Sequence, residues 1–524
     1  MKKRLAWVIG ALIVSTWAAC NCGHDQGVPC ISVSDCAVGQ SCVAGFCGTG
    51  DGDGGPPGTD GGRGDGGSGD GGPSDGGCVN FECQQVACPD GGVTTLTGKV
   101  YDPSGQVPLY NAVVYVPNGQ TQPFTPGVSC DRCGAVTTGS PLVSTLTRPD
   151  GTFSLENVPT GSNIPMVIQI GRWRRQVTIP TVPSCAVTPI TDVNLLRLPR
   201  NKSEGDIPQM AIATGNADPF ECLLLKMGIS ASEFTAPTGN GRVHYYRQNG
   251  IDTSPPAPPG SSLWSDGGTL RNYDVVLLPC EGAQNVKPSL ATQNIIDYTA
   301  AGGRVFTTHY GYVWVAFAQN PFPTTGDWRP DPNQTDNPPD PFTVTVDQSF
   351  PKGSAFAQWL QNVDAGTTLG SIDLHETRHD LWAADGGSTR WLYGQVRGNP
   401  SVQHMTFNTP VNPPGQADGG AGLQCGRLVF SDFHVTTAAL TGQPNFPASC
   451  AAAPLTPQEK ALVFMLFDVS SCIQRDDVAP TICAGVRQAC SDSNPCCTGL
   501  VCKAPSGAVC AHGETDCHCG ALLN

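Results

Sequence analysis

The sequence predicts a multidomain protein in which a β-sandwich precedes an α/β domain with a parallel sheet, with small disulfide-rich modules flanking both. Residues 95–200 alternate apolar and polar side chains between turn residues, as half-buried strands do. Residues 272–316 run through an apolar strand, a helical pattern and a second apolar strand, which is the order of a βαβ unit. Twenty-five cysteines among 524 residues indicate a disulfide framework.

Residues 1–19 have the pattern of a signal peptide. Three basic residues at positions 2–4 precede the apolar run Leu5–Val14, which is too short to span a bilayer. The Ala-Ala-Cys junction that ends at Cys20 resembles the lipobox of bacterial lipoproteins. This resemblance implies that Cys20 is lipidated and becomes the N-terminus of an exported protein. The implied partner is the lipid bilayer, and the implied location is the outer membrane, cell surface or periplasm.

The 24 cysteines beyond Cys20 form three groups of eight. Residues 20–47, with a short segment at 78–94, and residues 483–524 are too small to hold a core and are expected to need disulfides. The C-terminal module resembles knottin or colipase-like modules. Residues 48–77 include 16 glycines, which predicts a disordered linker. Because five of the first eight cysteines precede the linker and three follow it, internal pairing predicts at least one disulfide across it.

Four short motifs between residues 95 and 200 carry a family resemblance. They are Gly98-x-Val100, Pro108-Leu109-x-Asn111-Ala112, Asp150-Gly151-x-Phe153 and Val158-Pro159-x-Gly161. Together they resemble carboxypeptidase-regulatory-like domains. The resemblance implies a transthyretin-like β-sandwich that is non-catalytic and is grouped with carbohydrate-binding-like folds.

Two features of this domain could have a function beyond folding. A basic and aromatic run could stack a sugar or bind an anion, or it could be an ordinary exposed strand face; its residues are Arg172, Trp173, Arg174 and Arg175. Cys130 and Cys133 have the spacing of a redox pair. Since no βαβ pattern surrounds them, we expect a structural staple within their loop instead.

The α/β domain is predicted over residues 207–472. Asp274–Pro279 and Arg304–Thr308 are short apolar runs, and the helical pattern between them opens at Pro288. Two parallel strands joined by a crossover helix follow from this order. Ligands of such sheets bind beyond the carboxyl ends of the strands. The residues directly after the two runs are therefore the expected site.

The same residues resemble class I glutamine amidotransferases and the related trehalose-utilisation-type proteins. The matching stretches are LLPCEG, YTAAGGRVFTTHYG and, further on, GRLVFSDFHVT. The resemblance implies a flavodoxin-like parallel sheet. It also implies a degenerate catalytic apparatus, because His309 stands where the family has its nucleophilic cysteine. Phe433 and His434 remain from the second catalytic element, but the acid that follows them in the family is absent.

Three residues at the predicted strand ends are the candidate catalytic residues: Cys280, His309 and His434. With Glu281 or Asp432 nearby, two imidazoles and a carboxylate could bind a metal ion, or they could be remnants of a lost active site. Cys280 could act as a nucleophile. In an exported protein we expect it to form a disulfide instead, for which Cys222 is the suggested partner.

His375-Glu376-Thr377-Arg378-His379 is a literal HExxH motif. Zinc peptidases place this motif on a long helix, so that both histidines bind zinc and the glutamate activates water. Here a strand-like run precedes the motif, and residues 383–388 (AADGGS) would end a helix soon after it. The expectation is a set of polar residues in a loop, with His375, Glu376 and His379 kept as weak metal-site candidates.

The overall charge of the chain limits the kinds of partner that it can bind. A net charge of −15 argues against nucleic acid as a partner. The leading prediction is a lipid-anchored, non-catalytic envelope protein without a cofactor, whose partner is a carbohydrate or another envelope component. A hydrolase using the pocket around His309 and His434 is the alternative, and a zinc peptidase acting through His375–His379 is the second.

Overall fold

The structure is a computed structural model that describes residues 41–43, 46–48, 78–133, 137–249, 256–413, 424–436, 446–448, 450, 452–482, 490, 496, 500–510 and 516–521. The chain consists of two compact units, Met1–Gly76 and Gly77–Asn524. In the first unit, β1 (Ser41–Val43) and β2 (Phe46–Gly48) form an antiparallel hairpin. The predicted signal peptide, Cys20 and the linker beyond residue 48 lie outside the described residues.

Residues 95–200, which we call the β domain, form two sheets. A four-stranded antiparallel sheet has the order β5 (Pro141–Leu146), β4 (Val113–Pro117), β7 (Gly161–Ile170) and β8 (Trp173–Val182). A three-stranded sheet has the order β6 (Thr152–Glu156), β3 (Thr95–Lys99) and β9 (Val187–Pro189). The short helices η2 (Asn80–Gln84) and α1 (Val193–Leu196) flank them. Apolar side chains from both sheets contribute to one core, as the alternating pattern predicted.

Residues 207–472, which we call the α/β domain, are built on a ten-stranded mixed sheet. Its parallel half has the order β11 (Phe234–Thr235), β12 (Val243–Arg247), β10 (Met210–Thr214), β13 (Val275–Leu278), β14 (Arg304–Thr308) and β21 (Gly426–Ser431). Its antiparallel half continues with β20 (Asn399–Thr409), β19 (Ser388–Val396), β16 (Phe342–Val346) and β17 (Ser371–Leu374). The prediction of a parallel sheet is therefore correct for only part of it.

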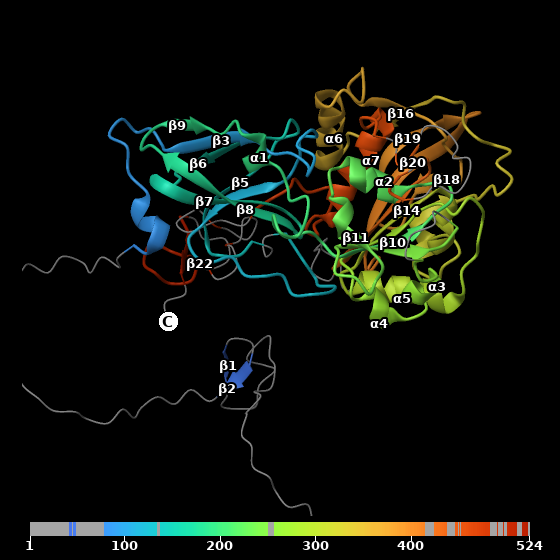
Figure 1. The fold of residues 1–524 in the computed structure, drawn as a ribbon, viewed down its shortest axis with the longest axis horizontal. Helices are drawn as coiled ribbons and strands as arrows, with labels where there is room; N and C mark the ends of the chain where they lie inside the picture. The colour runs from blue at the N-terminus through green and yellow to red at the C-terminus, as the bar shows by residue number, and fades with distance from the viewer. Residues whose placement is uncertain are drawn as a thin grey trace, which may run out of the picture. The chain divides into compact units, whose positions relative to one another are not determined.

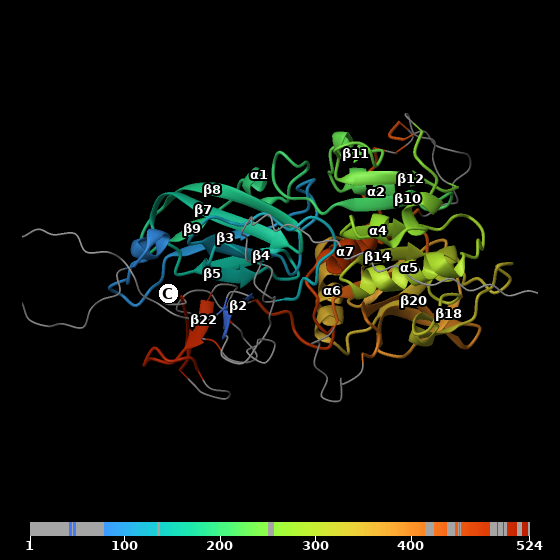
Figure 2. The same ribbon diagram turned by 90° about the horizontal axis from the view of Figure 1, so that it is seen from below.

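Helices cover both faces of this sheet (Figures 1 and 2). The helices α2 (Phe220–Lys226), α6 (Pro351–Asn362) and α7 (Pro457–Ser470) share one core with Ile212, Leu277 and Phe306. The helices α3 (Ser261–Trp264), α4 (Gly267–Leu270) and α5 (Ser289–Ala300) share the other core with Ala211, Val276 and Val305. Alternate strand residues thus point to opposite cores, which explains why β10, β13 and β14 are buried along their whole length.

The remaining short elements are connections. The 3-10 helices η3 (Ala231–Glu233) and η4 (His309–Trp314) precede β11 and follow β14 of the sheet, and η5 (Phe322–Thr325) leads into β15. Outside the main sheet, β15 (Gly326–Trp328) pairs with β18 (Leu381–Ala384). In the C-terminal module β22 (Leu500–Lys503) pairs with β23 (His518–Ala521), next to disulfides Cys490–Cys502, Cys496–Cys519 and Cys510–Cys517.

The β domain and the α/β domain share a continuous core. Tyr110 stacks on Phe464 of α7 with ring centroids 6.0 Å apart, and Trp173 packs against Phe467 of the same helix. The Trp359 indole of α6 donates a 2.8 Å hydrogen bond to the carbonyl of Pro108. Burial of large aromatic side chains is among the strongest apolar contributions to stability, so the two domains stabilise each other.

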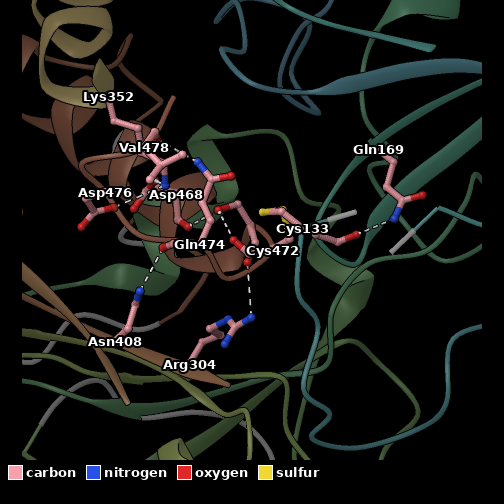
Figure 3. The surroundings of a disulfide bond; sticks show 12 residues. Cys133, Gln169, Arg304, Lys352, Asn408, Asp468, Cys472, Gln474, Asp476 and Val478 are labelled. Carbon is pink, nitrogen blue, oxygen red and sulfur yellow. Dashed lines mark hydrogen bonds and ion pairs between the residues drawn. A yellow bond between two sulfur atoms is a disulfide. The ribbon is translucent and has the colours of Figure 1, made fainter. Parts of the chain in front are cut away.

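Two disulfides cross-link these domains, and both overturn a prediction. Cys130 pairs with Cys425 and Cys133 pairs with Cys472, so the two cysteines do not form a staple within their own loop. Figure 3 shows the second bond, which joins Cys133 to the residue two positions after α7 ends. The nearby Asp468 of α7 forms a 2.7 Å ion pair with Lys352, and both side chains are buried. The loop that carries Cys130 and Cys133 lies against the α/β domain, so each cysteine bonds to a cysteine of that domain instead of to the other.

Other cysteine predictions also need correction. Cys78 pairs with Cys83, and Cys88 pairs with Cys185 of the β domain. The three cysteines after the linker are therefore all bonded without a disulfide across it, and the first group of eight does not pair only within itself. The eight disulfides among the described residues agree with folding outside the reducing cytosol. No helix of the described residues is long and apolar enough to cross a membrane.

The predicted binding run at Arg172–Arg175 is mostly interior. Arg172, Trp173 and Arg174 are 8%, 2% and 6% exposed. Arg172 forms ion pairs with Asp131 at 2.8 Å and with Asp274 of the α/β domain at 2.7 Å. Arg174 pairs with Asp206, and Arg175 donates to the carbonyl of Asn194. The arginine side chains of this run are therefore committed to contacts within the protein, and the possible sugar-stacking or anion-binding role stays a prediction.

Candidate functional site

Four adjacent parallel strands are each followed by a residue whose polar side chain lies at the same edge of the sheet. Asp218 follows β10, Cys280 follows β13, His309 follows β14 and His434 follows β21. The chain order reverses between β10 and β13, since β12 lies on one side of β10 and β13 on the other. Crevices beyond the carboxyl ends at such a reversal are the usual ligand sites of open α/β sheets.

Cys280 and His309 are in direct contact. Cys280 Sγ lies 3.3 Å from His309 Nδ1, and the two residues are 0% and 1% exposed. His309 has a φ of 37°, a left-handed conformation that is rare outside glycine and is typical of strained functional turns. It is the first residue of η4 and directly follows β14, where the sequence resemblance places the elbow. Cys280 forms no disulfide, contrary to expectation; its suggested partner Cys222 pairs with Cys450.

Burial keeps this pair uncharged. It raises the pKa of the Cys280 thiol far above its ordinary value, and the carboxylate of Asp218 raises it further. Burial also lowers the pKa of His309 well below its ordinary value, and the neighbouring His434 and Arg378 act in the same direction. A thiolate–imidazolium pair, which a cysteine nucleophile requires, is therefore disfavoured by the protein alone.

Asp218 supplies the carboxylate that is absent after His434 in the sequence. Asp218 Oδ1 lies 3.1 Å from His434 Nδ1 and accepts a 2.6 Å hydrogen bond from the Val435 amide. Its second oxygen accepts a 2.5 Å bond from the Thr308 hydroxyl, and Thr308 in turn accepts a bond from the Cys280 amide. The fully buried Asp218 thus orients His434 and connects three strand ends.

A pocket of about 200 Å³ opens beside these residues. Cys280, His309 and His434 line it, together with Glu376 and Arg378. Arg378 donates a 3.0 Å hydrogen bond to Glu376 Oε2, and its buried Nε has no hydrogen-bond partner among the described residues. The pocket wall therefore presents a carboxylate and a guanidinium next to the imidazoles.

Only the central part of the HExxH motif reaches this pocket. His375–His379 follows β17 as an irregular segment instead of a helix, with Glu376 at a φ of 51°. His375 Nδ1 contacts Asp340 at 2.6 Å, whereas His379 contacts Asp336 and the carbonyl of Pro400, each at 2.9 Å. The two histidines thus bind different partners, in a geometry unlike the one a zinc peptidase needs.

A buried carboxyl pair lies behind His309. Asp380 Oδ2 is 3.7 Å from His309 Nε2, and neither atom has a hydrogen-bond partner among the described residues. Asp432 accepts a 2.7 Å bond from the Asp380 amide. Burial raises the pKa of Asp380 to about 6, and burial together with the charge of Asp380 raises the pKa of Asp432 well above its ordinary value. Glu281, the other predicted neighbour, instead forms an ion pair with Lys287 at 2.5 Å.

The structure brings Cys280, His309 and His434 together as a possible ligand set. One ligand atom from each lies within 4.8 Å of the others. Sequence reasoning found these three residues but missed Asp218 and the positions of Glu376 and Arg378 at the pocket. Asp218 could have been found by the strand-end rule, since it follows the predicted strand Met210–Thr214.

No protein-family model and no curated protein matches the chain. Among solved structures, it is similar to a ThuA-like protein from Bacteroides uniformis, with 11% identity, 49% of this chain and 88% of that chain covered, and a TM-score of 0.26. It is also similar to a cytoplasmic protein from Salmonella typhimurium, with 10% identity, coverages of 50% and 99%, and a TM-score of 0.28. A ThuA-like protein from Parabacteroides merdae matches with 13% identity, coverages of 53% and 96%, and a TM-score of 0.25. At these low TM-scores the similarities establish neither a family nor an activity.

Proposed function

We propose that the α/β domain hydrolyses an ester or amide bond in the strand-end pocket. The observation that supports this most directly is the pocket wall, which joins Glu376, Arg378 and the Asp218-bound His434. These side chains offer a base, a cation and an oriented imidazole at one place. The non-catalytic binding function stays a prediction, but the residues expected to carry it in the β domain are largely buried.

Glu376 and Arg378 have distinct roles in this reaction. A water molecule adds to the carbonyl carbon of the substrate while Glu376 accepts one of its protons. The Arg378 guanidinium stabilises the negative charge that develops on the carbonyl oxygen. As the C–O or C–N bond breaks, Glu376 returns the proton to the leaving group, which releases a carboxylic acid and an alcohol or amine.

A panel of ester and amide substrates tests the proposal with the full mature chain. Wild type is expected to turn over at least one of them, and His434→Ala is expected to lose that activity while its thermal unfolding stays cooperative. His375→Ala is the matched control, because His375 faces Asp340 outside the pocket and should be dispensable. Loss of activity in His375→Ala with retention in His434→Ala would instead favour the zinc peptidase alternative, and an inactive wild type would refute the proposal.

We also propose that the mature protein is anchored in the cell envelope through a lipid on Cys20. The proposal is supported by the signal-peptide pattern and by the many disulfides. Cys20→Ser is expected to be exported but to lose membrane association, as measured by fractionation. Cys22→Ser, two residues away, is expected to stay with the membrane. Membrane association of Cys20→Ser at the wild-type level would contradict the anchor.

A further inference from the structure

The cluster of Cys280, His309 and His434 has the dimensions of a tetrahedral metal site. Zinc binds sulfur at about 2.3 Å and imidazole nitrogen at about 2.0–2.1 Å, so two such ligands on one ion lie about 3.5 Å apart. Cys280 Sγ and His309 Nδ1 are 3.3 Å apart, and the His434 ring centroid lies 4.8 Å from that of His309. Small side-chain rotations would bring all three onto one ion.

Each imidazole of the cluster has a carboxylate at its other nitrogen. His434 Nδ1 contacts Asp218 at 3.1 Å, which leaves Nε2 as its ligand atom. His309 Nε2 faces Asp380 Oδ2 at 3.7 Å, which leaves Nδ1, the atom beside Cys280. Metal-binding histidines almost always donate the N–H of their second ring nitrogen to a carboxylate, a backbone carbonyl or water, which orients the ring and fixes its tautomer. His434 and Asp218 form such a pair, whereas Asp380 faces His309 at a distance longer than a hydrogen bond.

The free thiol of Cys280 also indicates a metal site. Among the cysteines whose side chains the structure describes, it alone is not in a disulfide, although its neighbours along the chain are oxidised. A thiol and two imidazoles favour zinc over magnesium or calcium, which prefer oxygen ligands. Three protein ligands beside an open pocket are the arrangement of catalytic zinc sites, in which the fourth position is left to water or substrate.

We propose that Cys280, His309 and His434 bind one zinc ion, with Asp218 and Asp380 as positioning residues. This inference rests on the proposed hydrolysis and deepens it, and it departs from the sequence-based expectation of no cofactor. Zinc would act as a Lewis acid that makes a bound water easier to deprotonate, with Glu376 as the nearby base. It would also compensate the negative charge of the Cys280 thiolate in a buried place.

Metal binding can be tested independently of any substrate. Full-length mature protein is stripped with a chelator, titrated with Co²⁺ as a spectroscopic substitute for zinc, and analysed for metal content after zinc reloading. Wild type is expected to bind one ion per chain and to show a thiolate-to-cobalt charge-transfer band. Cys280→Ser should lose the band, and its affinity should fall by more than the about 10–100-fold typical of outer-shell changes.

Two further variants keep the test decisive. His309→Ala should weaken binding like Cys280→Ser, and Glu376→Gln should bind zinc like wild type because Glu376 is not a ligand. No binding by wild type, or binding by Cys280→Ser and His309→Ala as tight as that of wild type, would overturn the zinc site. Stoichiometric zinc in a protein without hydrolytic activity would instead uphold the site and refute the proposed function, so the two failures are distinguishable.

Discussion

Glu376→Gln is expected to lower kcat by about 10²–10⁴-fold, which is the range for loss of a general base. Glutamine has the same shape and can still accept the 3.0 Å hydrogen bond from Arg378, but it cannot take a proton from water. KM should change little, because the substitution removes a group that acts mainly in the transition state. Steady-state kinetics on the best substrate of the panel would measure both constants.

Asp373→Asn is the matched control for this substitution. It makes the same loss of charge three residues earlier, on β17, where Asp373 bonds Thr343 at the surface. Its kcat is expected to match that of wild type. If Glu376→Gln retained full kcat, another group would have to be the base and the assigned role of Glu376 would be wrong.

Replacing Cys133 and Cys472 by alanine is expected to lower the free energy of unfolding by about 4 kcal/mol. The bond joins residues 339 apart in the sequence, but Cys130–Cys425 already closes most of that loop. The additional loop therefore has roughly 50 residues, for which the chain-entropy relation gives this value. Loss of both bonds should have a larger effect, because no disulfide between described residues would then join the β domain and the α/β domain.

The Cys78–Cys83 disulfide provides the comparison. It closes a loop of only 5 residues in sequence separation, and its removal is expected to cost about 2 kcal/mol. Denaturant unfolding of both double-alanine variants, monitored by tryptophan fluorescence, would rank them. An equal or smaller effect at Cys133–Cys472 would show that this cross-link does little to hold the two domains together.

The βαβ unit could be predicted from the sequence because its signals are local. Apolar runs, a helix-opening proline and a glycine pair mark β13, α5 and β14 within about one turn of their ends. The cluster of Cys280, His309 and His434 was predictable for the same reason, since each follows a recognisable strand. What the patterns could not show is which strands become neighbours.

The missed contacts all depend on chain segments that are distant in sequence. Asp218 lies 216 residues before His434, and only the strand order brings the two together. The alternation around Arg172 predicts a strand with an exposed face, yet Arg172 is buried and forms an ion pair with Asp274 of the α/β domain. Cys133 likewise forms a disulfide with a cysteine of the other domain, Cys472. Local periodicity predicts where helices and strands form. It does not predict which of their side chains a second domain will bury and contact.

Anomalous X-ray diffraction at the zinc edge, from crystals of the zinc-loaded full-length mature protein, tests the central claim most directly. We predict one strong peak in the strand-end pocket, about 2.3 Å from Cys280 Sγ and about 2.0–2.1 Å from His309 Nδ1 and His434 Nε2. The fourth ligand should be a water molecule on the side of Glu376. A pocket without a peak, or a peak between His375 and His379 in its place, would contradict the account.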